Sequence, residues 1–394
     1  MAQLRSGSIL GALAGALCIW WVGCSLEPVR LGVVLPMSGP YATYGASLER
    51  GVRVAVDRVN REGGVQGRRL EVLVRDSGSR PEQAVMEFQE LIIKEKVPAV
   101  VGGGTSAEAL AMAATAERER RVLLSPSASS PELTPVGEWV FRNWPSDEIE
   151  AHTMADFAAF TLHVTRIAIV EEESAYARGI AGAFVTHFEM AGRSDERISL
   201  PMKGTDFLET VKRVQAVRPE VQAVYLVGYG GKVVPLQHAL IASRLDLPVL
   251  SVSTLSDGDI LRRSASDLEN VVFARPSFDL DNDSPVSQEF LVAYQSRFGG
   301  EPDIYAAHAY DSVRLLAEAM AMEGIGPEEV KRGLLKIKNF PGASGSITFD
   351  SNGDIVQTFE LCVIKGGKAI PLARAGDDIL TALQKRVDIL RFGG

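Results

Sequence analysis

The fold of this chain is decided by a glycine-rich stretch and a serine-rich one, which read Ala99-Val100-Val101-Gly102-Gly103-Gly104-Thr105-Ser106 and Val122-Leu123-Leu124-Ser125-Pro126-Ser127-Ala128-Ser129-Ser130-Pro131. An alanine-rich run with helical character lies between them. Short apolar runs such as 99–101 are typical of strands that are buried on both faces. The order strand, turn, helix, strand, loop therefore predicts part of a parallel, doubly wound α/β sheet.

The turn and the loop place hydrogen-bonding groups at one end of that predicted sheet. The glycines at 102–104 let the backbone turn sharply and let a small molecule approach it closely. Thr105 or Ser106 can cap the following helix, whose first amide groups and dipole favour a carboxylate. Because ligands of open α/β sheets bind at the carboxyl ends of strands, the stretch predicts a site for a small anion. It contains neither a nucleotide P-loop pattern nor a dinucleotide fingerprint.

The same alternation of strands and helices continues on both sides of this stretch. It predicts a first set of strands at 29–35, 70–74, 99–101, 122–124 and 139–142, and a second set at 166–170, 197–200, 223–227, 249–252 and 271–273. Helices are expected between the strands, and three more at 286–298, 304–322 and 327–338. A hairpin is expected from 346–349 and 355–364, and the apolar spacing after 377 is typical of an amphipathic helix.

This pattern predicts the fold class α/β, with two doubly wound lobes joined by a three-crossing hinge. The expected divisions are 1–23 as a lipoprotein signal peptide, 24–28 as a linker, 29–144 with 277–345 as lobe 1, 145–276 with 346–376 as lobe 2, and 377–394 as a C-terminal tail.

The composition narrows the possible partners. The chain has 394 residues, enough for two lobes with sizeable cores, and a formal net charge of −9. An acidic balance of this size argues against nucleic acid as a partner. No long apolar span occurs outside the N-terminus.

The N-terminus has the features of an export signal. Arg5 is the only charged residue among the first 23, and an apolar run at 9–22 is too short to span a membrane comfortably. The run ends in Gly23-Cys24, which resembles the lipobox at which bacterial lipoproteins are cleaved and lipidated, although Trp21 stands where leucine is usual. We therefore expect a lipid on Cys24 and an extracytoplasmic, membrane-anchored protein in the periplasm or at the cell surface. An ordinary secretory signal and an uncleaved anchor are the alternatives.

No catalytic or metal-binding set is recognisable. The five histidines are scattered, and Cys362 is the only cysteine after Cys24, in an apolar run that predicts a buried strand position. No Gly-x-Ser-x-Gly nucleophile motif occurs. We expect no enzyme activity, no cofactor and no metal site.

Several motifs in order resemble the type I periplasmic binding proteins of the Leu/Ile/Val-binding family, which deliver amino acids to ABC transporters. The resemblance runs from about residue 29 to about residue 368. It rests on Gly32-Val33-Val34-Leu35-Pro36-Met37-Ser38-Gly39-Pro40, Glu62-Gly63-Gly64-Val65-Gln66-Gly67, Val101-Gly102-Gly103, Ser125-Pro126-Ser127-Ala128, Pro131-Glu132-Leu133-Thr134 and Ala309-Tyr310-Asp311.

The resemblance implies a set of ligand-binding residues. Ser106 would bind the ligand carboxylate, Ala128 would offer its carbonyl to the ligand amine, and Ser129 would bind on the carboxylate and amine side. Three tyrosines would line the pocket with rings that are apolar on their faces and polar at their tips. The full set is Tyr44, Ser106, Ser127, Ala128, Ser129, Tyr176, Tyr229, Ser253 and Thr254.

One departure from the family pattern concerns the ligand amine. Amino-acid binders of this family place an acidic residue after the strand expected at 249–252, whereas this chain has Ser253 or Thr254 there. A buried ammonium without a charged partner is costly. Asp257 could substitute, although capping the next helix is its expected role. Amides, urea, and aromatic or short-chain carboxylates therefore remain open as ligands beside amino acids.

The sequence thus predicts a lipid-anchored solute-binding protein that captures a branched-chain amino acid or similar small carboxylate and delivers it to an ABC permease. The alternative is a sensory binding protein for amides, urea or amine-free carboxylates that presents its ligand state to a separate receptor. The two differ in their physical partner, a permease or a sensor. An enzyme using the same cleft would turn its ligand over, and no motif calls for that.

Overall fold

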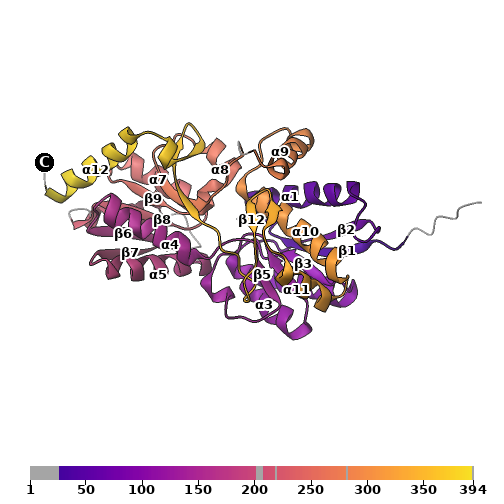
Figure 1. Ribbon diagram of the computed structural model, residues 1–394. Coiled ribbons are helices and arrows are strands. Elements are labelled where there is room, and N and C mark those ends of the chain that lie inside the picture. The colour runs from indigo at the N-terminus through magenta and orange to yellow at the C-terminus, as the bar shows by residue number, and fades with distance from the viewer. Residues whose placement is uncertain (1–25, 201–206, 218–219, 281–282, 393–394) are drawn as a thin grey trace, which may run out of the picture.

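Two α/β lobes lie side by side in the computed structural model, which describes residues 26–200, 207–217, 220–280 and 283–392 (Figure 1). The expected signal peptide and Cys24 lie outside the described residues. Helices of the described part are α1 (Ala42–Arg61), α2 (Pro81–Gln89), α3 (Ser106–Glu119), α4 (Asp147–Asp156), α5 (Ala175–Met190), α6 (Phe207–Val217), α7 (Gly230–Ala242), α8 (Gly258–Arg263), α9 (Pro285–Phe298), α10 (Ile304–Glu323), α11 (Pro327–Lys336) and α12 (Asp377–Phe392).

The first lobe contains a five-stranded parallel sheet in the order β2-β1-β3-β4-β5. Its strands are β1 (Val29–Leu35), β2 (Leu70–Asp76), β3 (Ala99–Gly102), β4 (Val122–Ser125) and β5 (Val140–Arg142). The predicted strand positions are confirmed, with ends that differ by one or two residues.

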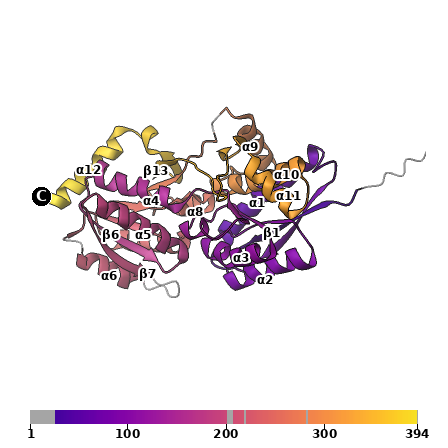
Figure 2. The same cartoon turned by 60° about the horizontal axis from the view of Figure 1, so that its bottom comes forward.

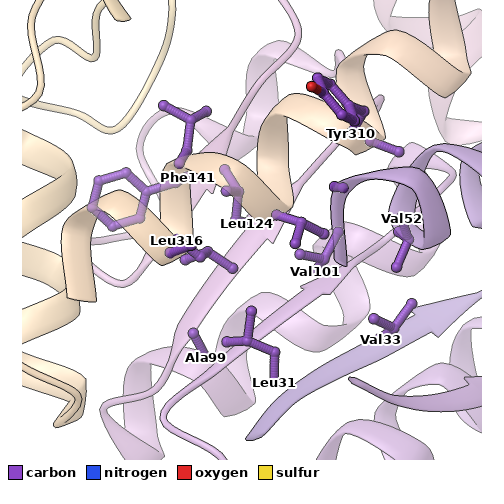
Figure 3. Packing of buried hydrophobic residues seen from close by; sticks show 14 of the residues in the cluster. Leu31, Val33, Val52, Ala99, Val101, Leu124, Phe141, Tyr310 and Leu316 are labelled. Atoms are coloured by element: carbon purple, nitrogen blue, oxygen red, sulfur yellow. The ribbon is translucent and has the colours of Figure 1, made fainter. Parts of the chain in front are cut away.

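Successive strand residues point to opposite faces of this sheet, and helices cover both faces. Leu31, Val33 and Leu35 of β1 belong to one core cluster with α1 and α10, and Val34 belongs to another with α2 and α3. Figure 3 shows the first of these cores, where Leu31, Val101 and Leu124 of the strands lie near Tyr310 and Leu316 of α10. The nearly continuous apolar sequence of β1 is therefore explained by helices on both faces.

The second lobe contains a seven-stranded mixed sheet in the order β14-β13-β10-β9-β8-β6-β7. Its strands are β6 (Arg166–Glu172), β7 (Ser194–Leu200), β8 (Ala223–Val227), β9 (Val249–Ser251), β10 (Val272–Pro276), β13 (Phe359–Lys365) and β14 (Lys368–Pro371). Strands β6 to β10 are parallel, and β13 runs antiparallel to β10. Ile167 and Ile169 face a core with α4, α5 and α12, and Ala168 and Val170 face a core with α6 and α7.

The chain passes between the lobes three times, as the sequence predicts. It leaves the first sheet after β5, returns after β10 to place α9, α10 and α11 on the first lobe, and crosses again to β13. Figure 2 shows α12 on the second lobe, at the end of the molecule opposite β1.

The predicted hairpin of 346–349 with 355–364 is wrong. Phe349 and Ile355 share only an isolated bridge, and two other hairpins form instead, β11 (Phe340–Gly342) with β12 (Gly345–Ile347) and β13 with β14. Ile347, Phe349 and Ile355 lie in the first lobe's core. The third crossing therefore falls after Ile355, later than the expected boundary at 345, because these apolar side chains are buried against the first lobe.

Within the described part of the chain, no helix is both long and apolar enough to cross a membrane.

Candidate functional site

A small hollow of about 210 Å³ lies where the two lobes meet. Tyrosine rings from the two lobes nearly fill it in this closed arrangement, so a solute needs the lobes to move apart. Residues of both lobes line it, namely Tyr44, Ser127, Ser129, Trp144, Tyr176, Tyr229, Ser253, Thr254 and Tyr305.

Seven of the nine predicted site residues line this hollow, and the exceptions are Ser106 and Ala128. The Ser106 hydroxyl is buried and accepts the amides of Ser129 and Ser130 at 3.4 and 3.3 Å. Ala128 is fully buried, and its amide donates to the hydroxyl of Ser125 at 2.9 Å. Both residues therefore support the loop at 125–130, called the serine loop below, but do not line the hollow.

Aromatic rings from both lobes form the walls. Tyr229, which precedes α7, lies 6.1 Å from Tyr44 of α1 between ring centroids and 5.1 Å from Tyr176 of α5. Tyr305 of α10 contacts Tyr44 at 4.4 Å and stacks on Trp144 at 5.0 Å with the planes 7° apart. Burial raises the pKa of these tyrosines, so their hydroxyls are neutral at ordinary pH.

Tyr229 is positioned by a carboxylate at the end of the neighbouring strand. Its backbone amide donates to Glu172 of β6 at 2.8 Å. Glu172 is 1% exposed, and burial raises the pKa of its carboxyl. The position of Tyr229 thus depends on the pairing of β6 with β8, which brings Glu172 next to it.

Three hydroxyls in the lining donate their protons to protein oxygens. Ser127 donates to the carbonyl of Gly104 at 3.0 Å, and Thr254 donates to the carbonyl of Gly228 at 2.6 Å. Ser253 donates to Oε2 of Glu150 at 2.8 Å. A hydroxyl that has donated its proton can only accept from a ligand.

Two buried carboxylates stand behind the second-lobe side of the hollow. Asp147 and Glu150 are three residues apart on α4, and both are 0% exposed. Burial raises the pKa of Asp147 to about 7 despite the nearby charge of Arg142. Burial and the charge of Asp147 raise the pKa of Glu150 well above its ordinary value.

Trp144, Tyr305 and Glu150 belong to the site although they were not predicted from the sequence. Trp144 follows β5 at the carboxyl edge of the sheet, so its position was a usable signal. Tyr305 lies in the first turn of a helix that also packs the core, where nothing local marks it. Glu150 meets Ser253 across 103 residues, and only tertiary packing brings the two together.

The expected helix caps at Thr105 and Asp257 are confirmed. Thr105 caps α3, and Asp257 caps α8 by accepting the amides of Asp259 and Ile260. Ser146, whose hydroxyl accepts the amide of Glu148, caps α4. Asp147 is the first residue of α4, and its side chain is buried.

No group of three or more potential metal ligands occurs among the described residues. Cys362 is buried in β13, as predicted, and burial raises the pKa of its thiol to about 12.

Two α/β lobes, three crossings and a small polar and aromatic hollow between the lobes define a solute-binding protein. A family model described as periplasmic binding protein matches residues 28–368. The chain therefore belongs to the periplasmic binding protein family, and its relatives place it among the type I members of the branched-chain amino acid group.

Three of those relatives illustrate the match. A Leu/Ile/Val-binding protein homologue of Brucella melitensis is 24% identical over 369 residues, 92% of this chain and 99% of the relative. The LivJ substrate-binding protein of Streptococcus pneumoniae, solved with isoleucine, is 26% identical with a TM-score of 0.80, covering 87% of this chain and 98% of that one. The leucine-binding protein LivK of Thermotoga maritima has a TM-score of 0.81 at 24% identity, covering 86% and 97%.

Proposed function

We propose that this protein captures a small carboxylate-bearing solute, a branched-chain amino acid or a similar acid, and delivers it to an ABC permease. The observation that carries the proposal is the hollow of about 210 Å³, which both lobes line with hydroxyl groups and aromatic rings. Aromatic walls with a few fixed polar groups are the usual lining of a small-molecule site.

The comparisons support this ligand class. The related LivJ protein was solved with isoleucine, and the match to it covers almost the whole of both chains. Apolar side chains of a branched amino acid suit the ring faces of Tyr176, Tyr229 and Trp144. On the first-lobe side Ser129 lines the hollow, at the place where the family resemblance expects the carboxylate.

A ligand panel tests the binding function. Protein from Ser25 onward is melted with leucine, isoleucine, valine, simple amides, urea and amine-free carboxylates. A ligand at a hundred times its dissociation constant should stabilise the fold by about 2.7 kcal/mol, which raises the melting temperature by several degrees. No shift with any member would contradict the proposal.

Trp144→Phe provides a site-specific test of the same hollow. The smaller ring loses its stacking on Tyr305, so we expect weaker binding of whichever ligand the panel identifies. Trp139→Phe is the matched control, because Trp139 is equally buried in the first lobe but does not line the hollow. Equal effects of the two changes on affinity would place the ligand elsewhere.

The anchor and the transport step belong to the same proposal. Incorporation of a labelled fatty acid in cells expressing the full chain, and its loss in Cys24→Ala, would support lipidation. Ligand uptake that depends on this protein and a membrane permease would support transport. Binding without uptake, together with a sensor as physical partner, would favour the sensory alternative.

A further inference from the structure

Three hydroxyls around Ser253 donate their protons into the protein. Ser253 and Thr254 both donate their hydroxyl protons into the protein, to Glu150 and to the carbonyl of Gly228. Tyr305 uses its proton as well, because its hydroxyl donates to the carbonyl of Ser253 at 2.8 Å. Around Ser253 the hollow therefore offers oxygen lone pairs, which suit a group rich in N–H donors, whereas the hydroxyl of Tyr176 still has its proton free.

Glu150 places a buried carboxyl group directly behind this surface. Its Oε1 accepts the amide of Ser253 at 2.6 Å, and its Oε2 accepts the hydroxyl at 2.8 Å. Among the described residues, neither Glu150 nor Asp147 forms an ion pair. Arg142, the cation that acts on Asp147, has its guanidinium occupied by Asp354, Thr134 and two carbonyls. When Glu150 is ionised, its charge has no cation partner among the described residues, which favours the arrival of a cationic group.

A further unpartnered atom points to a ligand here. The hydroxyl of Tyr176 is buried and has no hydrogen-bond partner, although Tyr176 lines the hollow and is 3% exposed. Buried polar atoms are nearly always paired, so an orphaned hydroxyl in a binding site indicates a missing polar group. The charges of Glu150 and Asp147 both act on this tyrosine.

We propose that Glu150 determines the specificity of the hollow by holding Ser253 as a hydrogen-bond acceptor backed by negative charge, so that the second lobe receives the ammonium group of an α-amino acid. The inference rests on the proposed function and refines it, because it selects amine-bearing ligands over amine-free acids. Glu150 thus takes the place of the acidic residue that is missing at positions 253 and 254.

The protonation state of Glu150 decides which group donates in the hydrogen bond between Ser253 and Oε2 of Glu150. When Glu150 is ionised, Ser253 must donate to it and can only accept from the ligand. When Oε2 carries a proton, that proton can be donated to Ser253, which frees the serine hydroxyl to donate into the hollow. An ammonium ligand therefore favours the ionised form, and an amine-free carboxylate or carbonyl ligand favours the protonated form.

Binding of an amino acid should consequently release a proton. The groups facing Glu150 are Asp147 on α4, Ser253, and the tyrosines Tyr176, Tyr225 and Tyr305. Because burial and Asp147 raise the pKa of Glu150, the empty site retains its proton to higher pH than an exposed glutamate does. The affinity for an amino acid should therefore rise with pH until the empty site is ionised, and then level off.

The test compares leucine with 4-methylpentanoate, which is leucine without its amine. Calorimetric titration of the wild-type protein should show a clear preference for leucine and proton release on leucine binding. In Glu150→Gln the leucine affinity should fall at least tenfold, whereas 4-methylpentanoate should change less than threefold. Proton release should disappear in Glu150→Gln and persist in Asp147→Asn.

Two further variants separate specificity from folding. Ser253→Ala removes the acceptor but keeps the charge, and it should weaken leucine and leave 4-methylpentanoate unchanged. Glu108→Gln is the control, since Glu108 is a buried carboxyl on α3 that binds Ser77 and does not line the hollow. Its preference for leucine should match that of the wild type.

The contrary outcomes are distinct. An equal loss of both ligands in Glu150→Gln would mean that the residue is merely structural and would overturn the inference. Binding of 4-methylpentanoate but not of leucine by the wild type would also overturn it, while leaving the proposed function intact. Binding of no member of the wider panel would contradict the proposed function and the inference with it.

Discussion

At the residue scale, the buried side chain of Arg142 holds together the loops at the edge of the hollow. Arg142 at the end of β5 is 2% exposed and pairs with Asp354 through Nε and Nη2 at 2.6 and 2.9 Å. Its Nη1 donates to the carbonyls of Ser129 and Ser130 at 2.9 Å each. One side chain thereby fixes the serine loop and ties it to the segment that leads to the third crossing.

Arg142→Met should lower the free energy of unfolding by about 3–5 kcal/mol, because it breaks a largely buried ion pair with Asp354 and removes the hydrogen bonds that Arg142 donates to Ser129, Ser130 and Thr134. Denaturant titration measures the loss. The double variant Arg142→Met with Asp354→Asn should recover part of it, since no unpaired charge then remains. A loss below about 1 kcal/mol in the single variant would contradict this account.

Asp147→Asn should stabilise the protein at neutral and higher pH. The pKa of Asp147 rises from 3.8 to about 7 on folding, so the folded state binds the proton more tightly and its stability falls as pH rises from about 4 to 7. At 1.4 kcal/mol per pH unit the penalty above pH 7 is on the order of 4 kcal/mol. Unfolding curves of both proteins should converge below pH 4, and a pH-independent difference would refute the prediction.

At the scale of elements, the first lobe depends on a close approach between α1 and α10. Gly51 of α1 is buried, and a Cβ built on it would lie 2.0 Å from the carbonyl oxygen of Ala306 in α10. Only glycine permits this approach, which brings α10 over the sheet and places Tyr305 against Tyr44. The packing of two core helices therefore positions an aromatic wall of the site.

Gly51→Ala should destabilise the protein by more than about 2 kcal/mol, because the helices must separate to admit the methyl group. Gly182→Ala in α5 is the matched control, since a Cβ there meets nothing within 4 Å. That change should be neutral or stabilise by up to about 1 kcal/mol, as expected for alanine in a helix. Thermal melting of both variants tests the pair, and equal effects would show that the approach is unimportant.

At the scale of the whole molecule, the two lobes are closed on each other. Tyr41 lies 4.5 Å from Tyr229 of the other lobe between ring centroids, and Asp303 accepts the amide of Gly258 at 3.2 Å across the lobes. Two rigid sheets joined by crossings are typical of proteins that open and close around a ligand by hinge motion. We propose that the lobes separate about the three crossings to admit the solute.

Acid should favour the closed form through Asp257. Burial, and then the charge of Asp303, raise the pKa of Asp257 to about 6 in the closed structure. Opening exposes the group and lowers its pKa, so protonation near pH 5 favours closure, by about 3 kcal/mol at most. Small-angle scattering without ligand should give a smaller radius of gyration at pH 5 than at pH 8. In Asp257→Asn, which can still cap α8, this dependence should vanish, and an unchanged dependence would exclude Asp257 as the cause.

The sequence by itself determined the two doubly wound sheets, the three crossings and most of the hollow's lining. It could do so because strand alternation, glycine turns and helix caps are local signals, and because parallel sheets collect their functional loops at one edge. Seven of the nine predicted site residues line the hollow for this reason. The hairpin after 345 was predicted wrongly because β-pairing partners are chosen by distant packing.

Only the tertiary structure decided which buried groups contact the residues that line the hollow. Glu150 reads in the sequence as one more charge at the start of a helix, yet folding buries it against Ser253, 103 residues away. Tyr305 and Trp144 become a stacked wall only when α10 packs over the end of β5. The direction of each hydroxyl proton and the charge at the back of the site depend on such long-range contacts, which no local pattern encodes.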